Sequence, residues 1–275
     1  MNRALERLAA FQGIPQHYLD TIRLYAALET RGIADAVPAK QLDLESRFAD
    51  ALYKALQAFY SAPFTQGYSD IPESSEAAIV GWLKRQYGQN PQWASGVIST
   101  MLPFLRQGLK SGVEQGLELL DAPVDGVIVS NEELLADVAD RASSLMAVDS
   151  EVSLTNTTIN NLGKTLFNAV VSDIAFGVAL AAMAAHIQAR SILIAEYETS
   201  RLVSIGMVET YQRNGVVHMV YNIRDSDACK ICTPDDGKQF LIKPELWLPR
   251  HAHCRCFYTP DTTNWNPPDE WWQGK

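Results

Sequence analysis

Cysteine is scarce in this chain, and its few cysteines lie close together. All four fall between Cys229 and Cys256 in a sequence of 275 residues. A disulfide-stabilised scaffold distributes its cysteines along the chain, so this clustering favours a single local site instead. A chain of this length also buries a sizeable core without covalent links.

Long apolar runs are also missing. The most apolar stretch, residues 174–187, is rich in alanine and too short to span a bilayer. The N-terminal residues show no apolar run followed by a small-residue cleavage site. We therefore expect no secretory signal and no membrane partner, and we expect the chain to be made and folded in a cytoplasm.

An excess of basic residues is the third absence. The chain has 23 basic and 32 acidic residues, which gives a formal net charge of -9. This balance argues against a protein that coats nucleic acid with its whole surface. Apolar residues make up 47% of the chain and charged residues 20%, which is the composition of a folded globular protein.

Helical patterns dominate the first three quarters of the sequence. Leu44, Phe48, Leu52, Leu56 and Phe59 recur every three or four residues and so share one helical face. The prolines at 38 and 63 bracket this helix, and a second helical block is expected over 75–120, interrupted at 90–91.

The next part of the chain is expected to contain a linker and three further helices. Residues 121–130 have the turn chemistry of a linker, and Ser130 is a candidate N-cap. Helical patterning then resumes and is interrupted over 153–161, where Thr and Asn predict a break. Two more helices are expected to cover about 162–214.

After Asn214 and Gly215 the pattern changes to short β-branched and aromatic runs. We expect strands within 216–223 and 239–242, joined through the turn residues Asp236 and Gly237. Frequent prolines predict that the remainder is loop. The expected fold class is therefore α+β: a mostly α-helical N-terminal and central part, followed by a small C-terminal strand-and-loop module clasped by a Cys/His site.

The cysteine spacing predicts that clasp. A Cys-Lys-Ile-Cys knuckle is followed, after twenty-one intervening residues, by Cys-Arg-Cys, and two histidines lie just before this second group. A knuckle turns two side chains toward one point, and a hairpin return supplies the rest of a tetrahedral site. Zinc is the metal expected for such nitrogen and sulfur ligands, in a structural role. The candidate metal ligands are Cys229, Cys232, His251, Cys254 and Cys256.

Two other states of the cysteines remain open from the spacing alone. They would pair as disulfides if the protein matured outside a reducing compartment. Alternatively they are free thiols that merely lie close together. His253 is a spare imidazole next to the expected ligands.

The segment from Arg190 to Cys256 resembles the Mu-F-like head morphogenesis family, the minor head proteins of tailed bacteriophages. The matching positions are Asp227 (shifted by one), Cys229, Cys232, Asp236, Gly237, His251, Cys254, Arg255 and Cys256. The resemblance extends more faintly upstream to about residue 134. Where the family has an Arg-Thr-Glu-Thr stretch, this chain has Glu196, Tyr197, Glu198 and Thr199, and Asp235 stands where the family's turn has leucine.

The resemblance implies a structural, non-enzymatic minor head protein in the virion, at the portal vertex of the capsid, acting in head assembly and in the packaging or ejection of DNA. Its implied organisation is a helical, portal-binding region at 1–125, the family domain at 126–260 with the clasp at 227–256, and a Trp/Pro-rich tail at 261–275. The portal protein is the expected partner, with the major capsid protein and the phage DNA as further candidates.

Two other functions stay open. Some relatives are compared with toxin or transferase modules, but loss of the motif arginine at position 196 argues against such an enzyme here. The other alternative is a zinc-ribbon nucleic-acid binder, for which Lys230 and Arg255 would be contact residues. The segment 201–256 has eight basic and six acidic residues, a weak electrostatic footprint for such binding.

Overall fold

We describe the protein from a computed structural model, in which residues 38–65, 72, 75–124, 132–147, 154–171, 176–223, 230–243, 248–251 and 254–266 are described. These residues form six α-helices and a small antiparallel sheet. The helices are α3 (Ala39–Thr65), α4 (Glu76–Gln89), α5 (Pro91–Leu119), α6 (Glu132–Met146), α7 (Leu154–Val171) and α8 (Phe176–Arg213). The strands are β1 (His218–Asn222), β2 (Gln239–Leu241) and β3 (Phe257–Pro260), and a 3-10 turn, η2, covers Thr233–Asp235. The predicted α+β class is confirmed.

The chain divides into two compact units, and α3, α5, α6 and α8 each supply residues to both of them. The first contains the described residues of Ala49–Leu102 and Ala136–Ile192, and the second those of Gly32–Phe48, Pro103–Leu135 and Leu193–Lys275. The predicted family boundaries, at 125 and 260, stay predictions. Among the described residues, no helix has the length and apolar character needed to cross a membrane.

The first unit is helical. In it α4 packs against α7, and Gly163 of α7 lies so close to α4 that an added Cβ would come within 2.3 Å of Val80. Ser75 caps α4 by accepting a hydrogen bond from the N–H of Ala78, as expected for a helix start. α4 ends at Gln89 and α5 begins at Pro91, which confirms the predicted interruption.

Two sequence predictions about helices were wrong. The break expected over 153–161 is helical from Leu154 on, because Ile159, Leu162 and Leu166 share one buried face and outweigh the low helix propensity of Thr and Asn. Pro63 was expected to end its helix, but α3 continues to Thr65 with this proline in its last turn. The N-cap predicted at Ser130 lies outside the described residues.

The second unit is built on an unusually close contact between α5 and α8. Gly108, Gly112 and Gly116 recur every four residues along α5 and face α8. A Cβ added at Gly112 would lie 2.2 Å from the carbonyl oxygen of Val203, and one added at Gly206 would lie 2.4 Å from that of Leu109. Only glycine permits this backbone approach, so these positions fix how the second half of α8 lies on α5.

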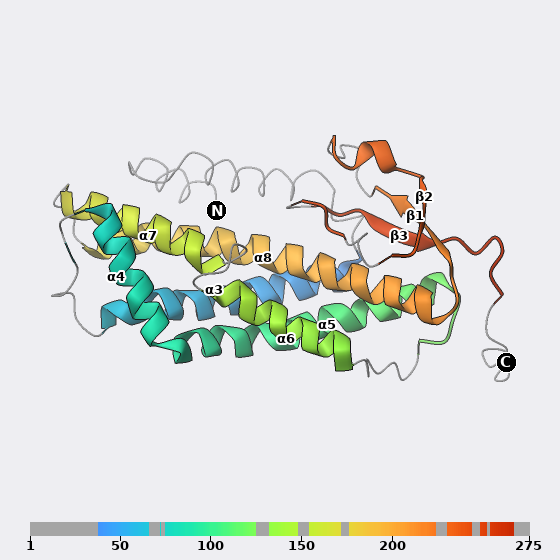
Figure 1. The fold of residues 1–275 in the computed structure, drawn as a ribbon, viewed down its shortest axis with the longest axis horizontal. Helices are drawn as coiled ribbons and strands as arrows, with labels where there is room; N and C mark the ends of the chain where they lie inside the picture. The colour runs from blue at the N-terminus through green and yellow to red at the C-terminus, as the bar shows by residue number, and fades with distance from the viewer. Residues whose placement is uncertain are drawn as a thin grey trace. The chain divides into compact units, whose positions relative to one another are not determined.

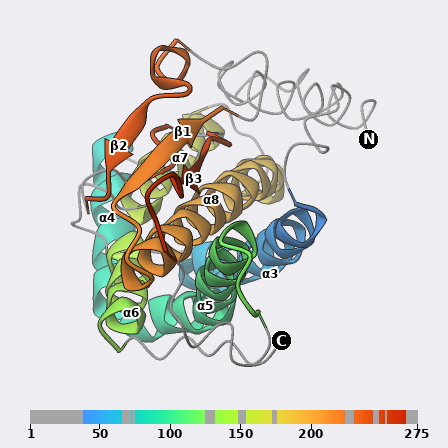
Figure 2. The ribbon, with the colours of Figure 1, turned by 90° about the vertical axis from the view of Figure 1, so that its right-hand side faces the viewer.

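A sharp helix end directs the chain from α8 into the sheet. Gly215 has a positive φ of 74°, and the N–H of Val216 donates to the carbonyl of Tyr211. This is a glycine-terminated helix cap, and it places Val216 and Tyr211 together in the core. The strands then pack beside the C-terminal part of α8 (Figures 1 and 2).

The sheet has the order β2-β1-β3, with both neighbours antiparallel to β1. The turn predicted at Asp236 and Gly237 is present, and Gly237 adopts a positive φ of 73° that favours glycine. The sheet accommodates Pro260 because it is the last residue of an edge strand, where its missing N–H is not needed for strand pairing.

Candidate metal centre

Strand register brings the candidate ligands together. Asn222, the last residue of β1, pairs with Phe257, the first residue of β3. The loop that leaves β1 and the loop that enters β3 therefore meet at one end of the sheet. The first loop leads to the turn containing Cys232, and the second carries His251 and Cys254. The clasp predicted from the spacing thus has a direct origin in the sheet topology.

Three of the predicted ligands converge. The ligand atoms of Cys232, His251 and Cys254, which we call the Cys/His cluster, all lie within 4.8 Å of one another. The Sγ of Cys232 lies 3.1 Å from the Nε2 of His251 and 3.9 Å from the Sγ of Cys254. Zinc–sulfur bonds of about 2.3 Å in a tetrahedron place two sulfurs about 3.8 Å apart, so the sulfur pair has the spacing of a zinc site.

The other predicted ligands have different outcomes. Cys229 and the spare His253 lie outside the described residues. Cys256 is described, but it does not belong to the group of three. A fourth protein ligand at Cys229 therefore stays a prediction.

The described cysteines form no disulfide with one another. The 3.9 Å between the sulfurs of Cys232 and Cys254 is well beyond the roughly 2.05 Å of a disulfide bond. Among the described residues, the disulfide alternative therefore has no pair that realises it.

The cluster is part of the hydrophobic core of the second unit. Cys232 and Cys254 are buried among Tyr221, Leu248 and Tyr258. A hydrogen bond from Cys256 lowers the pKa of Cys254 to about 5, against the opposing effect of burial, and raises the pKa of Cys256 far above its ordinary value. The lowered pKa of Cys254 favours the thiolate form, in which cysteine binds a metal.

A second set of contacts joins the same two loops. Asp235, three residues after Cys232, forms an ion pair with Arg250, which precedes His251. Asp235 also accepts a hydrogen bond of 2.8 Å from Lys238, and the Arg250 guanidinium lies 4.3 Å from the ring centre of Tyr221. These contacts lower the pKa of Asp235, chiefly through hydrogen bonds from Lys238 and Arg250. Asp235, which departs from the family pattern, therefore braces the two loops.

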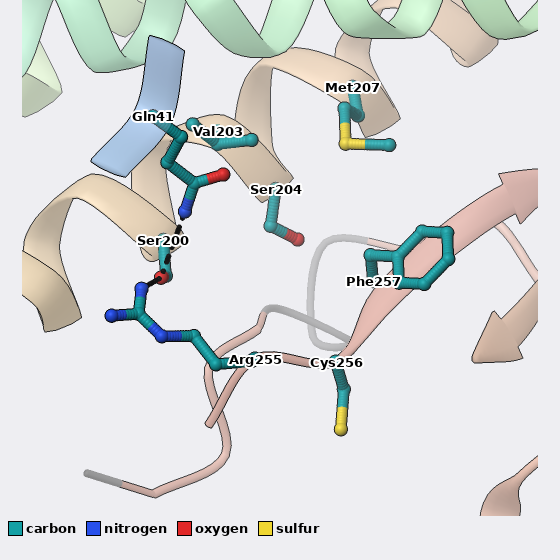
Figure 3. Close-up of a pocket in the computed structure, with 8 residues that line it drawn as sticks. All are labelled: Gln41, Ser200, Val203, Ser204, Met207, Arg255, Cys256 and Phe257. Carbon is teal, nitrogen blue, oxygen red and sulfur yellow. Dashed lines mark hydrogen bonds between the residues drawn. The ribbon is translucent and has the colours of Figure 1, made fainter. Parts of the chain in front are cut away.

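Arg255 ties the cluster to two helices. Its guanidinium donates to both carboxylate oxygens of Glu45 in α3, at 2.6 and 2.9 Å, and pairs with Glu196 in α8 at 2.9 Å. It also donates to the hydroxyl of Ser200 at 3.1 Å. Figure 3 shows this guanidinium directed at Ser200 while the sulfur of the next residue, Cys256, points away from the pocket.

The arginine contacts are largely shielded from solvent. The side chains of Arg255, Glu45 and Glu196 are 13%, 6% and 15% exposed. Burial raises the pKa of Glu45 above its ordinary value, and it outweighs the lowering by Arg255 and by the hydrogen bond from Gln41. Sequence reasoning missed this group because Glu45 reads as an ordinary polar residue beside Leu44 on an amphipathic helix.

The space beside Arg255 is small. A cavity of about 20 Å³ lies between α3, α8 and the start of β3, lined by the residues drawn in Figure 3. Pockets for small-molecule ligands are typically about 300 Å³ or larger. The buried hydroxyl of Ser204 has no hydrogen-bond partner among the described residues, and the cavity has room for about one water molecule there.

The motif residues of α8 are packed inward. Glu198 and Thr199 are each 1% exposed. The Cα of Thr199 would lie 3.8 Å from a Cβ added at Gly108 of α5. Glu198 pairs with Arg201 at 3.9 Å. These side chains serve the interior of the second unit.

The donor set fits a structural metal. Two buried thiol sulfurs and one imidazole nitrogen are soft and borderline ligands, which zinc accepts in tetrahedral structural sites. Cys232, His251 and Cys254 would hold the ion, which would cross-link the two loops at the end of the sheet.

No protein-family model, curated protein or solved structure matches the chain.

Proposed function

We propose that this chain is a structural minor head protein of a tailed bacteriophage, located at the portal vertex, in which the Cys/His cluster binds a structural zinc ion. The observation that carries the proposal is the convergence of Cys232, His251 and Cys254. These residues belong to the run of motif positions on which the resemblance to the head morphogenesis family rests.

The internal use of the motif residues supports a structural role. Arg255 is bound to Glu45 and Glu196, and Asp236 accepts a hydrogen bond of 3.0 Å from the N–H of Ile223. Gly237 forms the turn into β2. Each of these residues holds one part of the second unit to another, as expected of a module that has only a small sheet and needs a metal cross-link.

The same contacts weigh against the two alternatives. A transferase or toxin active site at the motif positions needs a cavity there that admits a substrate, and the space beside Arg255 holds about 20 Å³. A larger space of about 450 Å³ lies between α3 and α5, and none of the motif residues lines it. A zinc-ribbon nucleic-acid binder would need Arg255 at its surface, whereas this side chain is 13% exposed and bound to carboxylates. Lys230 is exposed and would be left as the contact of that pair.

The proposed partners are the portal protein first, and the major capsid protein and phage DNA next. The test is to purify proheads and mature particles of the phage that encodes the chain, and to locate the chain by mass spectrometry and by labelled electron microscopy. We expect it in few copies at the vertex that carries the portal. Its absence from both kinds of particle would contradict the proposal.

A co-purification experiment examines the partner separately. A tagged portal protein from the same genome is expected to retain the full chain. A variant lacking residues 1–37 removes the first part of the predicted portal-binding region, 1–125, and it should bind the portal protein more weakly while keeping its zinc. Equal retention of both forms would place the contact elsewhere in the chain.

A further inference from the structure

Arg255 occupies a position between the Cys/His cluster and two helices. Its backbone follows directly on Cys254, a residue of the cluster, while its guanidinium reaches Glu45 in α3 and Glu196 in α8. The side chain therefore spans from the loop that would hold the metal to both helices. A displacement of Cys254 moves the backbone from which the guanidinium extends, because the two residues share a peptide bond.

The described part of the loop that carries Arg255 lies outside regular secondary structure. Residues 254–256 belong to neither a helix nor a strand, and β3 begins only at Phe257. The N–H of Cys254 donates to the carbonyl of His251 at 3.2 Å, which is a bond within the same loop. A metal bound by Cys232, His251 and Cys254 would therefore fix the position from which Arg255 extends.

The first turns of α3 share polar partners with this guanidinium. Gln41 donates to Glu45 at 2.9 Å and to Ser200 at 3.4 Å, and Arg255 contacts the same two partners. Withdrawing the guanidinium would leave the buried carboxylates of Glu45 and Glu196 facing each other without this cation. Buried carboxylates in that state drive local rearrangement toward water.

We propose that Arg255 is a positioning residue that couples metal occupancy of the Cys/His cluster to the anchoring of the start of α3 on α8. With metal bound, Arg255 is held in place and residues 41–48 are anchored. When the metal is removed, the guanidinium withdraws and these residues are released. This inference rests on the proposed metal site, and it gives that site a regulatory effect on a helix within the predicted portal-binding region, residues 1–125.

The experiment is hydrogen–deuterium exchange of the full chain, measured with zinc bound and after removal of zinc by a chelator under reducing conditions. Native mass spectrometry of the same samples records metal occupancy. We expect amides of residues 41–48 to exchange at least tenfold faster without zinc. Peptides from α4 and α7, which belong to the first unit, should keep their rates.

Substitutions separate coupling from general stability. In Arg255→Gln, we expect residues 41–48 to exchange fast with zinc bound and to change no further on its removal. Arg255→Lys keeps the charge and should retain part of the response. Arg213→Gln removes an exposed arginine at the C-terminal end of α8. The ion pair of Arg213 is with Glu209, so this variant should behave as the natural chain.

Three results would overturn the proposal. Equal exchange of residues 41–48 in zinc-bound and zinc-free protein, with occupancy confirmed, would show that the metal site and α3 are independent while leaving the metal site intact. Loss of protection throughout α4 and α7 at the same time would show global unfolding instead of selective release. A chain that takes up no zinc in native mass spectrometry would contradict the metal site itself.

Discussion

Arg255 and Glu45 are separated by 210 residues in the sequence and are joined by two hydrogen bonds of 2.6 and 2.9 Å. Bidentate pairing of this kind is specific to arginine, because its guanidinium presents two parallel N–H donors to a carboxylate. The pair connects the loop that contains Cys254 and Cys256 with α3, the first described helix of the chain. Several consequences of this geometry are open to measurement.

Removing Arg255 should cost more than removing Glu45. Arg255→Gln leaves the buried carboxylate of Glu45 and the partly buried carboxylate of Glu196 without their shared cation, and breaking a buried ion pair typically lowers the free energy of unfolding by about 3–5 kcal/mol. Glu45→Gln keeps hydrogen-bonding atoms and leaves one carboxylate for one guanidinium, so we expect a loss below about 1.5 kcal/mol. Urea unfolding at neutral pH, followed by circular dichroism, compares the two; a larger loss for Glu45→Gln would contradict the assignment.

The pH dependence of Glu45 has a defined sign. Its pKa is raised in the folded protein, so between the unfolded value and the raised folded value the folded state binds more protons. The contribution of Glu45 to the free energy of unfolding therefore decreases as pH rises through this window. We expect Glu45→Gln to remove that decrease. Urea midpoints measured from pH 4.5 to 8 test this, and an unchanged pH profile in the variant would contradict it.

Gly112 should not tolerate a methyl group. An added Cβ would lie 2.2 Å from the backbone oxygen of Val203, so Gly112→Ala forces α5 and α8 apart and should lower the free energy of unfolding by roughly 3 kcal/mol or more. Gly96 lies in the same helix with nothing within 4 Å of an added Cβ. Gly96→Ala should therefore stabilise by up to about 1 kcal/mol through helix propensity. Thermal melts of both variants make the comparison, and equal melting temperatures would contradict the close helix contact.

The cysteines should divide by their part in metal binding. We expect Cys232→Ser and Cys254→Ser to lose zinc, because both belong to the Cys/His cluster. Cys256→Ser should retain it, since Cys256 lies outside that group. The zinc content of each purified variant is measured by inductively coupled plasma mass spectrometry. Loss of zinc in Cys256→Ser alone would make Cys256 a ligand and would contradict the three-residue cluster.

The brace between Asp235 and Arg250 should slow metal loss. Asp235→Asn removes the ion pair that joins the Cys232 loop to the His251 loop, so both loops separate more readily. We expect zinc to pass several-fold faster to a coloured chelator in this variant. Asp261→Asn, at another partly exposed loop carboxylate, whose hydrogen bonds come from Gln239 and Thr263, is the control. Identical transfer rates for Asp235→Asn and the natural chain would show that the ion pair between Asp235 and Arg250 does not slow metal loss.

Local patterns in the sequence predicted the local structure well. The periodicity of Leu44 to Phe59 predicted α3, and the Asn214-Gly215 pair marked the end of α8 because only glycine readily adopts the φ needed there. The knuckle and the downstream His-x-x-Cys predicted the meeting of Cys232, His251 and Cys254. In each case the information lies within a few residues of the feature.

Features that depend on tertiary contacts were not predictable in this way. The pairing of Arg255 with Glu45 depends on how α3 and the clasp loop are placed in the second unit, and no short-range pattern records it. β3 was hidden by its proline, and the start of α7 by Thr and Asn, because burial of Tyr258 and Ile159 outweighs local propensity. Trp265 was read as part of a tail, yet its indole N–H donates to the carbonyl of Asn214 at 2.6 Å.

The central claim is that the Cys/His cluster holds a structural metal ion. The most direct measurement is the metal content of the full chain, purified under reducing conditions without chelator and analysed by native mass spectrometry together with titration of accessible thiols. The account predicts one zinc ion per chain, with the thiols of Cys232 and Cys254 protected until the metal is removed. Metal-free protein in which all four cysteine thiols react at once under native conditions would contradict it.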